Sequence, residues 1–301
     1  MNARPLIRIP RMRLASGAAA PAGDIDQLIE FLRAHPRLLV LGGAGLSTTS
    51  GIPAYRDGDG RWLRRDPILY QDFIASETAR RRYWARSYFG WRLMRAARPN
   101  GAHRSLVDLE RAGRISLLVT QNVDGLHCAA GSQRLVELHG SLARVRCLSC
   151  GEMTERDALQ ERLERDNPGW NPEVLGYNPD GDAELDADAY PGFRIASCVS
   201  CGGALKPDVV FFGESVPAER VARIREAMQH SDAVLVLGSS LVVMSGYRIV
   251  REAAAAGLPV VAINQGRTRA DDLLRFKIDG DCTPALAGLA GLLDPSAAES
   301  A

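Results

Sequence analysis

Four cysteines have the spacing of metal ligands. Cys147-x-x-Cys150 and Cys198-x-x-Cys201 are two C-x-x-C pairs, and glycine follows each pair. Two pairs of this form are typical of a tetrahedral zinc site with four cysteine ligands. Because four thiolates fill the coordination shell, we expect one structural Zn2+ with no catalytic role. Two redox motifs or two disulfides are the alternatives.

A glycine-rich stretch follows an apolar segment. Residues 38–57 are LLVLGGAGLSTTSGIPAYRD. After a buried strand, Gly43-Ala44-Gly45 would let the backbone approach a pyrophosphate, and Arg56 offers a fixed cation. Thr48 stands where a third glycine is usual, so a tight turn that needs glycine only for positive φ is the alternative.

One histidine stands out as a candidate general base. His139 follows an apolar stretch and precedes Gly140, at the edge of the cysteine-containing segment. An imidazole at a strand end beside a nucleotide cleft can accept a proton near neutral pH. A hydrogen-bonded structural histidine is the alternative. Cys128 is expected to be a small core residue rather than a nucleophile.

The elements that must position these residues alternate between strands and helices. A capped amphipathic helix is expected over Asp24–Pro36. Short apolar strands are expected at Arg37–Gly42, Ile115–Thr120, Ala233–Gly238 and Pro259–Asn264, and helices at Ala218–His230 and Gly246–Gly257. This order predicts an α/β fold with a doubly wound, Rossmann-like parallel sheet. Small or polar residues follow three of the strands, at the sheet edge where ligands bind: Thr120–His127, Gly238–Leu241 and Asn264–Gly266.

Length and spacing suggest one large and one small unit. We expect the Rossmann-like domain to comprise residues 24–140 and 204–295, and a zinc module to comprise residues 141–203. Residues 152–195 look loop-rich with little core of their own. Residues 1–23 and 296–301 are expected to be a flexible leader and tail, and a transit peptide is the alternative for the leader.

Composition argues against several classes of protein. With 37 basic and 36 acidic residues, the formal charge is 37 − 36 = +1, which gives no drive toward nucleic acid or membranes. No apolar run reaches the length of a transmembrane helix. Six cysteines in 301 residues favour a reducing compartment, so we expect a cytoplasmic protein, which we also expect to be a monomer.

In combination, these motifs resemble the sirtuin family. The similarity rests on GAGLSTTSGIPAYRD, TQNVDGLH, HG, both C-x-x-C pairs, KPDVVFFGE, GSSLVV and NQG, in that order, and runs from about Asp24 to Pro295. It implies an NAD-dependent protein lysine deacylase that releases nicotinamide and O-acyl-ADP-ribose. RRYWARSYFGW, PDGD and SGYR resemble the class II branch, which includes mitochondrial lipoamidase-type sirtuins.

The resemblance assigns roles to individual residues. His139 would be the general base, with Asn122 and Asp124 as further catalytic residues. Val209, Phe211 and Phe212 would line the tunnel for the acyl-lysine of a protein substrate. The residues implied to contact NAD are Gly43, Ala44, Gly45, Ser47, Ile52, Pro53, Tyr55, Arg56, Gln121, Asn122, Val123, Asp124, Gly238, Ser239, Ser240, Asn264, Gln265, Gly266 and Cys282.

The sequence departs from the family pattern in the cofactor loop. Ala54 replaces the usual Asp after Gly-Ile-Pro, and Tyr55 replaces the commoner Phe. Tyr83-x-x-Arg86 has the form of a pair that marks sirtuins preferring acidic acyl groups, but it lies about four residues out of register.

Other functions remain open at this point. Protein mono-ADP-ribosyl transfer and long-chain or lipoyl-type deacylation would use the same scaffold. A non-catalytic NAD sensor is a third possibility. A zinc-ribbon nucleic-acid binder fits poorly, because the net charge is close to zero and the insert is acidic.

Overall fold

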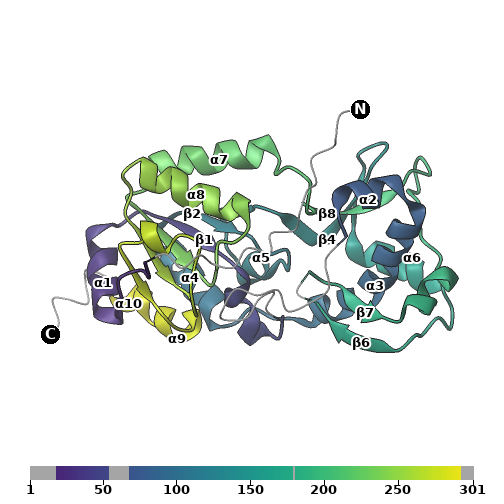
Figure 1. The fold of residues 1–301 in the computed structure, drawn as a ribbon, viewed down its shortest axis with the longest axis horizontal. Coiled ribbons are helices and arrows are strands. Elements are labelled where there is room, and N and C mark those ends of the chain that lie inside the picture. Colours follow the sequence, from purple (N-terminus) through teal and green to yellow (C-terminus); the bar gives the residue numbers. More distant parts are fainter. Residues whose placement is uncertain (1–17, 54–67, 179, 293–301) are drawn as a thin grey trace.

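A parallel six-stranded sheet forms the centre of the larger lobe (Figure 1). The computed structural model describes residues 18–53, 68–178 and 180–292. The strand order is β11 (Phe276–Ile278), β10 (Val260–Ile263), β9 (Ala233–Leu237), β1 (Leu38–Gly42), β2 (Ile115–Thr120) and β3 (Leu135–Glu137). Every pairing in it is parallel. The strands β1, β9 and β10 are buried throughout, as their continuous apolar sequences require.

Helices cover both faces of this sheet, so the predicted doubly wound architecture is confirmed. Leu38 and Val40 pack toward α1 (Ile25–Ala34), α4 (Gly101–Arg111), α9 (Cys282–Leu286) and α10 (Leu289–Leu292). Leu39 and Leu41 point to the other face, where α7 (Ala218–Gln229) and α8 (Met244–Ala255) pack (Figure 1). The alternation follows from the two-residue period of a strand.

The predicted elements agree with the structure to within about two residues, a typical uncertainty of helix and strand ends. Asp24 caps α1 with a capping box, in which Gln27 N–H donates to the Asp24 carboxylate at 2.8 Å. The two edge strands β3 and β11 were not predicted, because three residues each carry too little pattern. After β1 the chain forms only the short 3₁₀ turns η1 (Ala44–Leu46) and η2 (Thr48–Ser50).

The smaller lobe combines an antiparallel sheet with three helices (Figure 1). Its sheet has the order β5 (Met153–Glu155), β4 (Gly140–Cys147) and β8 (Leu205–Val209). The other elements of the lobe are α2 (Tyr70–Ala75), α3 (Glu77–Ala96), α6 (Arg156–Asp166), the hairpin β6 (Val174–Tyr177) and β7 (Ala183–Leu185), and η3 (Ala187–Gly192). Two short helices, α5 (Leu126–Ala130) and η4 (Asp271–Leu273), complete the described chain.

The expectation that residues 152–195 are loop-rich is wrong, because α6, β6, β7 and η3 lie in this segment, and the core of these elements is shared with α3. Leu159, Leu163 and Phe193 are buried in one cluster with Tyr88 and Phe89 of α3. The sequence did not show this shared core, because α3 supplies five of its sixteen buried residues from outside the insert. These contacts favour grouping α2 and α3 with the zinc module, and the exact domain boundaries stay a prediction.

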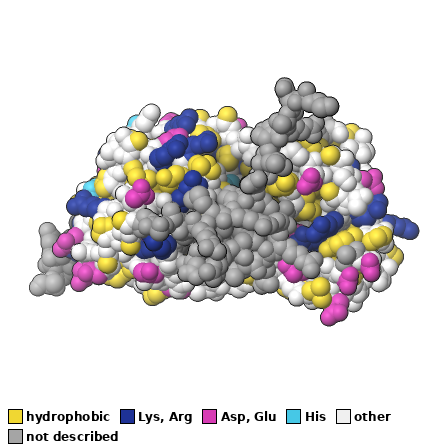
Figure 2. All heavy atoms as spheres, in the orientation of Figure 1, with side chains coloured by type: hydrophobic (Ala, Val, Ile, Leu, Met, Phe, Trp, Pro, Cys, Tyr) yellow, Lys and Arg dark blue, Asp and Glu magenta, His cyan; other side chains and the backbone are white. Residues whose placement is uncertain are grey.

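The distribution of charge on the surface agrees with the near-zero net charge of the sequence. In the described part of the face in Figure 2, basic and acidic side chains are interspersed. Among the residues that the structure describes, no helix combines the length and hydrophobicity needed to span a bilayer.

Gly140 gives the sharpest test of backbone packing within the sheet of the smaller lobe. Its φ is +83°, and a Cβ there would lie 1.9 Å from the Asp208 carbonyl oxygen. Gly113 has a similar φ of +72°, but a Cβ would meet nothing within 4 Å. We expect Gly113→Ala to cost about 1–2 kcal/mol of unfolding free energy, and Gly140→Ala to cost several times more because the backbone must move. Urea unfolding measures both, and equal costs would contradict this packing.

Candidate active site

A cavity of about 650 Å³ opens at the carboxyl edge of the parallel sheet. It runs along the ends of β1, β2, β9 and β10 and continues to the segment after β8. Most of the predicted ligand residues line it. They are Gly43, Ala44, Gly45, Gln121, Asn122, Val123, His139, Val209, Phe211, Phe212, Gly238, Ser239, Ser240, Asn264, Gln265 and Cys282.

Other predicted residues lie outside this lining. Ser47 and Asp124 sit behind it and bond each other, with the Ser47 hydroxyl donating to the Asp124 carboxylate at 2.7 Å. Ile52 packs in a small apolar cluster with Val209 and Leu126. Pro53 and Gly266 are described but do not line the cavity. Ala54, Tyr55 and Arg56 fall outside the described residues, so their predicted roles stay predictions.

The glycines at the end of β1 serve close backbone contact rather than positive φ. Gly43 has a φ of −131°, and Gly45 is absent from the positive-φ residues. A Cβ on Gly45 would lie 2.8 Å from Gly238 Cα, and Gly45 N–H donates to the Gly238 carbonyl at 2.8 Å. The loops after β1 and β9 therefore touch backbone to backbone, which leaves room for a ligand above them.

Polar side chains after β2 hold these loops together. The Gln121 amide donates to Ser239 Oγ at 2.9 Å, which ties β2 to the loop after β9. The Asn122 amide donates to the Gly43 carbonyl at 3.1 Å and to Ser47 Oγ at 3.0 Å. Burial raises the pKa of Asp124, an effect opposed by the hydrogen bonds from Leu126 N–H and Ser47. The edge of the sheet is thus preorganised by residues of three strand ends.

His139 is held in one tautomer. Its Nδ1 lies 2.8 Å from the Gln121 carbonyl oxygen, which can only accept, so Nδ1 carries the proton. Its Nε2 is then an acceptor, bonded to Ser245 Oγ at 2.7 Å. Burial lowers the pKa of His139, and the nearby charge of Arg220 acts in the same direction. A neutral imidazole that lines a cavity can take a proton from a ligand hydroxyl.

Ser245 is a site residue that the sequence analysis did not single out. It lies at the start of α8 and lines the cavity with His139. The only sequence signal was its place in SGYR, one residue after GSSLVV.

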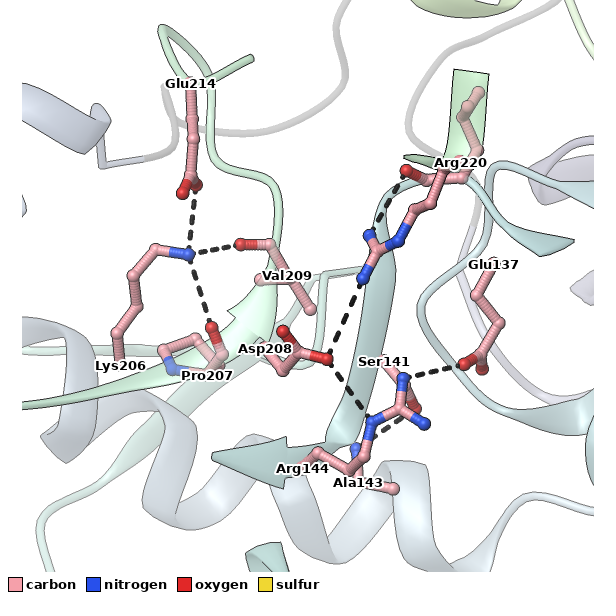
Figure 3. A network of polar contacts seen from close by, with 11 residues as sticks. Glu137, Ser141, Ala143, Arg144, Lys206, Pro207, Asp208, Val209, Glu214 and Arg220 are labelled. Carbon is pink, nitrogen blue, oxygen red and sulfur yellow. Dashed lines mark hydrogen bonds and ion pairs between the residues drawn. The ribbon is translucent and has the colours of Figure 1, made fainter. Parts of the chain in front are cut away.

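The segment after β8 is fixed beside His139. Val210 N–H donates to the His139 carbonyl at 2.8 Å, and Gly140 pairs with Val209. Figure 3 shows the Lys206 ammonium between Glu214 and the Val209 carbonyl. Lys206 Nζ lies 3.0 Å from a Glu214 oxygen, and the same carboxylate accepts from Phe211 N–H at 2.9 Å. This partly buried ion pair ties together the two ends of the loop that presents Val209 and Phe211.

A second ion network supports the same strands (Figure 3). Arg144 bridges Glu137, at 3.0 Å, and Asp208, at 3.3 Å. Arg220 donates to the Leu138 carbonyl at 3.4 Å and lies 3.9 Å from Asp208. Glu137 and Leu138, which precede His139, are therefore linked to β8 through Arg144 and to α7 through Arg220.

Two other histidines are buried and outside the cavity lining. The rings of His103 and His127 lie 4.6 Å apart. Burial lowers the pKa of His103 to about 4 and that of His127 to about 3. Both are neutral core residues. Cys282 is also buried, which raises the pKa of its thiol to about 12 and removes it as a nucleophile. Cys128 is exposed, contrary to the expectation of a core residue.

The four predicted zinc ligands come together. The sulfur atoms of Cys147, Cys150, Cys198 and Cys201 lie within 4.8 Å of one another, and all are free thiols. Cys147 and Cys201 are 3.5 Å apart, and Cys150 and Cys198 are 3.8 Å apart. A tetrahedral zinc with Zn–S bonds of about 2.3 Å needs sulfur separations of about 3.8 Å. The residues therefore fit a structural zinc ion.

Comparison with known proteins agrees with this geometry. Residues 43–245, more than half of the chain, match the Sir2 family. The chain belongs to the Sir2 family. The resemblance to sirtuins is thereby confirmed, and its class II branch stays a prediction.

Three similar proteins span most of this Sir2 chain. An NAD-dependent protein deacetylase of Xanthomonas campestris pv. campestris (strain 8004) is 54% identical over 268 residues, covering 89% of this chain and 92% of the relative. One of Bordetella bronchiseptica is 53% identical over 264 residues, covering 88% and 96%. A solved Sir2 complex with a p53 peptide and NAD+ is 26% identical with a TM-score of 0.69, covering 88% and 96%.

The cysteine cluster predicts one zinc ion per chain. We expect Cys147→Ala to lose the metal and to lower the unfolding midpoint, because the ion stabilises the folded module. The exposed Cys128→Ala is the matched control and should keep both. Elemental analysis and thermal unfolding measure this, and full zinc content in Cys147→Ala would contradict it.

The buried histidine pair predicts loss of stability in acid. At pH 7.5 and above, both rings are almost entirely neutral whether the chain is folded or unfolded, so they contribute almost no pH dependence. As the pH falls below that value the unfolded chain takes up protons that the folded chain refuses. For His127 alone this removes about 2 kcal/mol between pH 7.5 and 5.0. We expect His127→Phe to reduce that loss in urea unfolding, and the exposed His230→Gln to leave it unchanged. An equal loss in wild type and His127→Phe would refute the assignment.

Proposed function

We propose that this protein is an NAD-dependent protein lysine deacylase, and that acetyl-lysine is its principal substrate. The observation that carries the proposal is the unprotonated Nε2 of His139, held beside a cavity between the strand-end loops and the Val209–Phe212 segment. The products would be the free lysine, nicotinamide and O-acyl-ADP-ribose. Relatives named NAD-dependent protein deacetylases support the choice of acyl-lysine as substrate.

The nucleotide would occupy the strand-end edge. Bound NAD supplies an electrophilic ribose carbon, to which the acyl oxygen adds as nicotinamide leaves. The backbone at Gly43–Gly45 and Gly238–Ser240 would hold the pyrophosphate and its riboses, and Asn264 and Gln265 the adenosine half. Asp124 and Asn122 would act through the loop after β1, since both bond Ser47.

The base and the peptide would meet at the end of β8. His139 Nε2 would exchange its bond with Ser245 for one with a ribose hydroxyl and take that proton. The backbone at Val209–Phe212 would pair with an extended substrate peptide, and Val209 and Phe211 would enclose the lysine stem. The surrounding apolar side chains would exclude water from the reacting carbon.

The proposal also covers the location, the oligomeric state and the range of reactions of the protein. We propose a cytoplasmic monomer that does not act on nucleic acid or membranes. Lipoyl-type or long-chain deacylation would use the same cavity. Mono-ADP-ribosyl transfer would leave the ADP-ribose label on a protein acceptor, whereas deacylation places it in O-acyl-ADP-ribose.

Removing the base tests the proposal. An acetyl-lysine peptide with NAD should yield nicotinamide and O-acetyl-ADP-ribose, detected by mass spectrometry. His139→Ala should lower kcat by about 10²- to 10⁴-fold, while NAD still binds in calorimetry. The exposed His230→Ala should be unaffected. Unchanged turnover in His139→Ala would remove this residue as the base, and label retained on protein would favour ADP-ribosyl transfer.

The pKa of His139 predicts the pH profile. Because burial lowers it, the imidazole stays neutral to below pH 6.5. We expect kcat/KM to rise with pH and reach a plateau before neutrality, with its acidic midpoint below 6.5. A midpoint well above 6.5 would contradict the assignment.

A further inference from the structure

Part of the cavity wall is acidic, and it adjoins the proposed acyl-lysine segment. Asp180 and Asp182 line the same cavity as His139, together with Tyr83. The rings of Tyr83 and Phe211 lie 5.3 Å apart, which places this wall next to the residue proposed to enclose the lysine stem.

Backbone packing holds the two carboxyl groups in place. Gly90 of α3 lies against Gly181, where a Cβ on Gly90 would come within 2.0 Å of the Gly181 carbonyl oxygen. A Cβ on Gly181 would lie 2.5 Å from Leu142, which packs with Val209. The turn between Asp180 and Asp182 is thus pressed between α3 and the residues that line the acyl segment.

The charges of this wall are only partly balanced. Arg86 Nη2 lies 3.2 Å from Asp182 Oδ2, and the two side chains are 3% and 4% exposed. The Oδ1 atoms of Asp180 and Asp182 are buried and have no hydrogen-bond partner in the described structure. With both acids ionised, the formal charge of the trio is 1 − 2 = −1. Two unpartnered acceptors therefore lie buried within this wall of the cavity, and Arg86 Nη1 is an unpartnered donor in the same group.

The environment of the carboxyl groups disfavours further negative charge. Burial raises the pKa of both Asp180 and Asp182, and the charge of Arg86 opposes that shift. Arg86 itself does not line the cavity, because it is engaged by Asp182 and by the Ala183 carbonyl at 3.0 Å. Among the described residues, Arg82 also acts on Asp182, but neither Arg82 nor Arg86 lines the cavity, so a ligand carboxylate at this wall would meet the two acids first.

We propose that Asp180 and Asp182 select the acyl group, accepting chains that end in a hydrogen-bond donor and rejecting chains that end in a carboxylate. Suitable ends are an amide, a hydroxyl or an ammonium group, each of which can donate to a carboxylate of this wall. This inference rests on the proposed deacylase function and defines its substrate class.

Matched acyl peptides test it. Succinyl-, glutaryl- and adipoyl-lysine peptides are compared with their terminal amides and with ω-amino acyl chains of similar length, with acetyl-lysine as the reference. We expect each carboxylate to have a kcat/KM lower than that of its amide by roughly tenfold or more at the length that reaches the wall. Peptide affinity measured by fluorescence anisotropy should follow the same order.

Charge variants give a graded and opposite response. Asp182→Asn and Asp180→Asn each bring the formal charge of the trio to zero, and the double variant brings it to +1. Arg86→Gln brings it to −2. The ratio of kcat/KM for the amide peptide to that for the carboxylate peptide should fall in the two single Asp→Asn variants and fall further in the double variant, with a gain of glutaryl- or adipoyl-lysine turnover. The same ratio should rise in Arg86→Gln. The exposed Asp188→Asn, in the same insert, is the control and should match wild type.

The outcomes separate this inference from the proposed function. Turnover of acetyl-lysine with equal kcat/KM for carboxylate, amide and ammonium chains would overturn the inference alone. Discrimination that is unchanged in the folded Asp180→Asn/Asp182→Asn variant would also overturn it. Absence of NAD-dependent turnover with every peptide would overturn the proposed function and this inference together.

Discussion

The backbone contact between the loops after β1 and β9 sets the shape of the site. Gly45 and Gly238 approach so closely that a Cβ on either would overlap the other's backbone. Gln121 and Asn122 then tie the same loops to the end of β2. Because these strands are parallel and adjacent, their carboxyl ends form one continuous edge. The cavity exists because the glycines remove side chains where three strand ends converge.

The second lobe supplies what the sheet edge lacks. The strands β4 and β8 pair at Gly140 and Val209, so the proposed base, His139, and the proposed peptide-binding segment are fixed by the same ladder. The partly buried pair of Lys206 and Glu214 closes the loop beyond it. The zinc site takes no part in this chemistry. Its four cysteines fix the end of β4 and the segment just before β8, the two strands of this ladder. Acyl selection by Asp180 and Asp182 would also come from this lobe, whereas nucleotide binding would come from the sheet.

The sequence predicted the parts that depend on local pattern. Apolar strands, the capped helix α1 and the cysteine spacing each follow from neighbouring residues, and the structure agrees with them. The reason for Gly43 and Gly45 could not be predicted, because it is contact with a loop nearly two hundred residues away. The core of residues 152–195 was missed for the same reason, since Tyr88 and Phe89 complete it from α3. Ser245 and the pair of Arg86 with Asp182 likewise depend on tertiary contacts.

A crystal structure with a non-hydrolysable NAD analogue and an acetyl-lysine peptide tests the central claim most directly. The account predicts the nucleotide along the Gly45 and Gly238 edge, with a ribose hydroxyl at hydrogen-bond distance from His139 Nε2 in place of Ser245. It is contradicted if the ribose lies out of reach of this nitrogen, or if the nucleotide binds elsewhere on the protein.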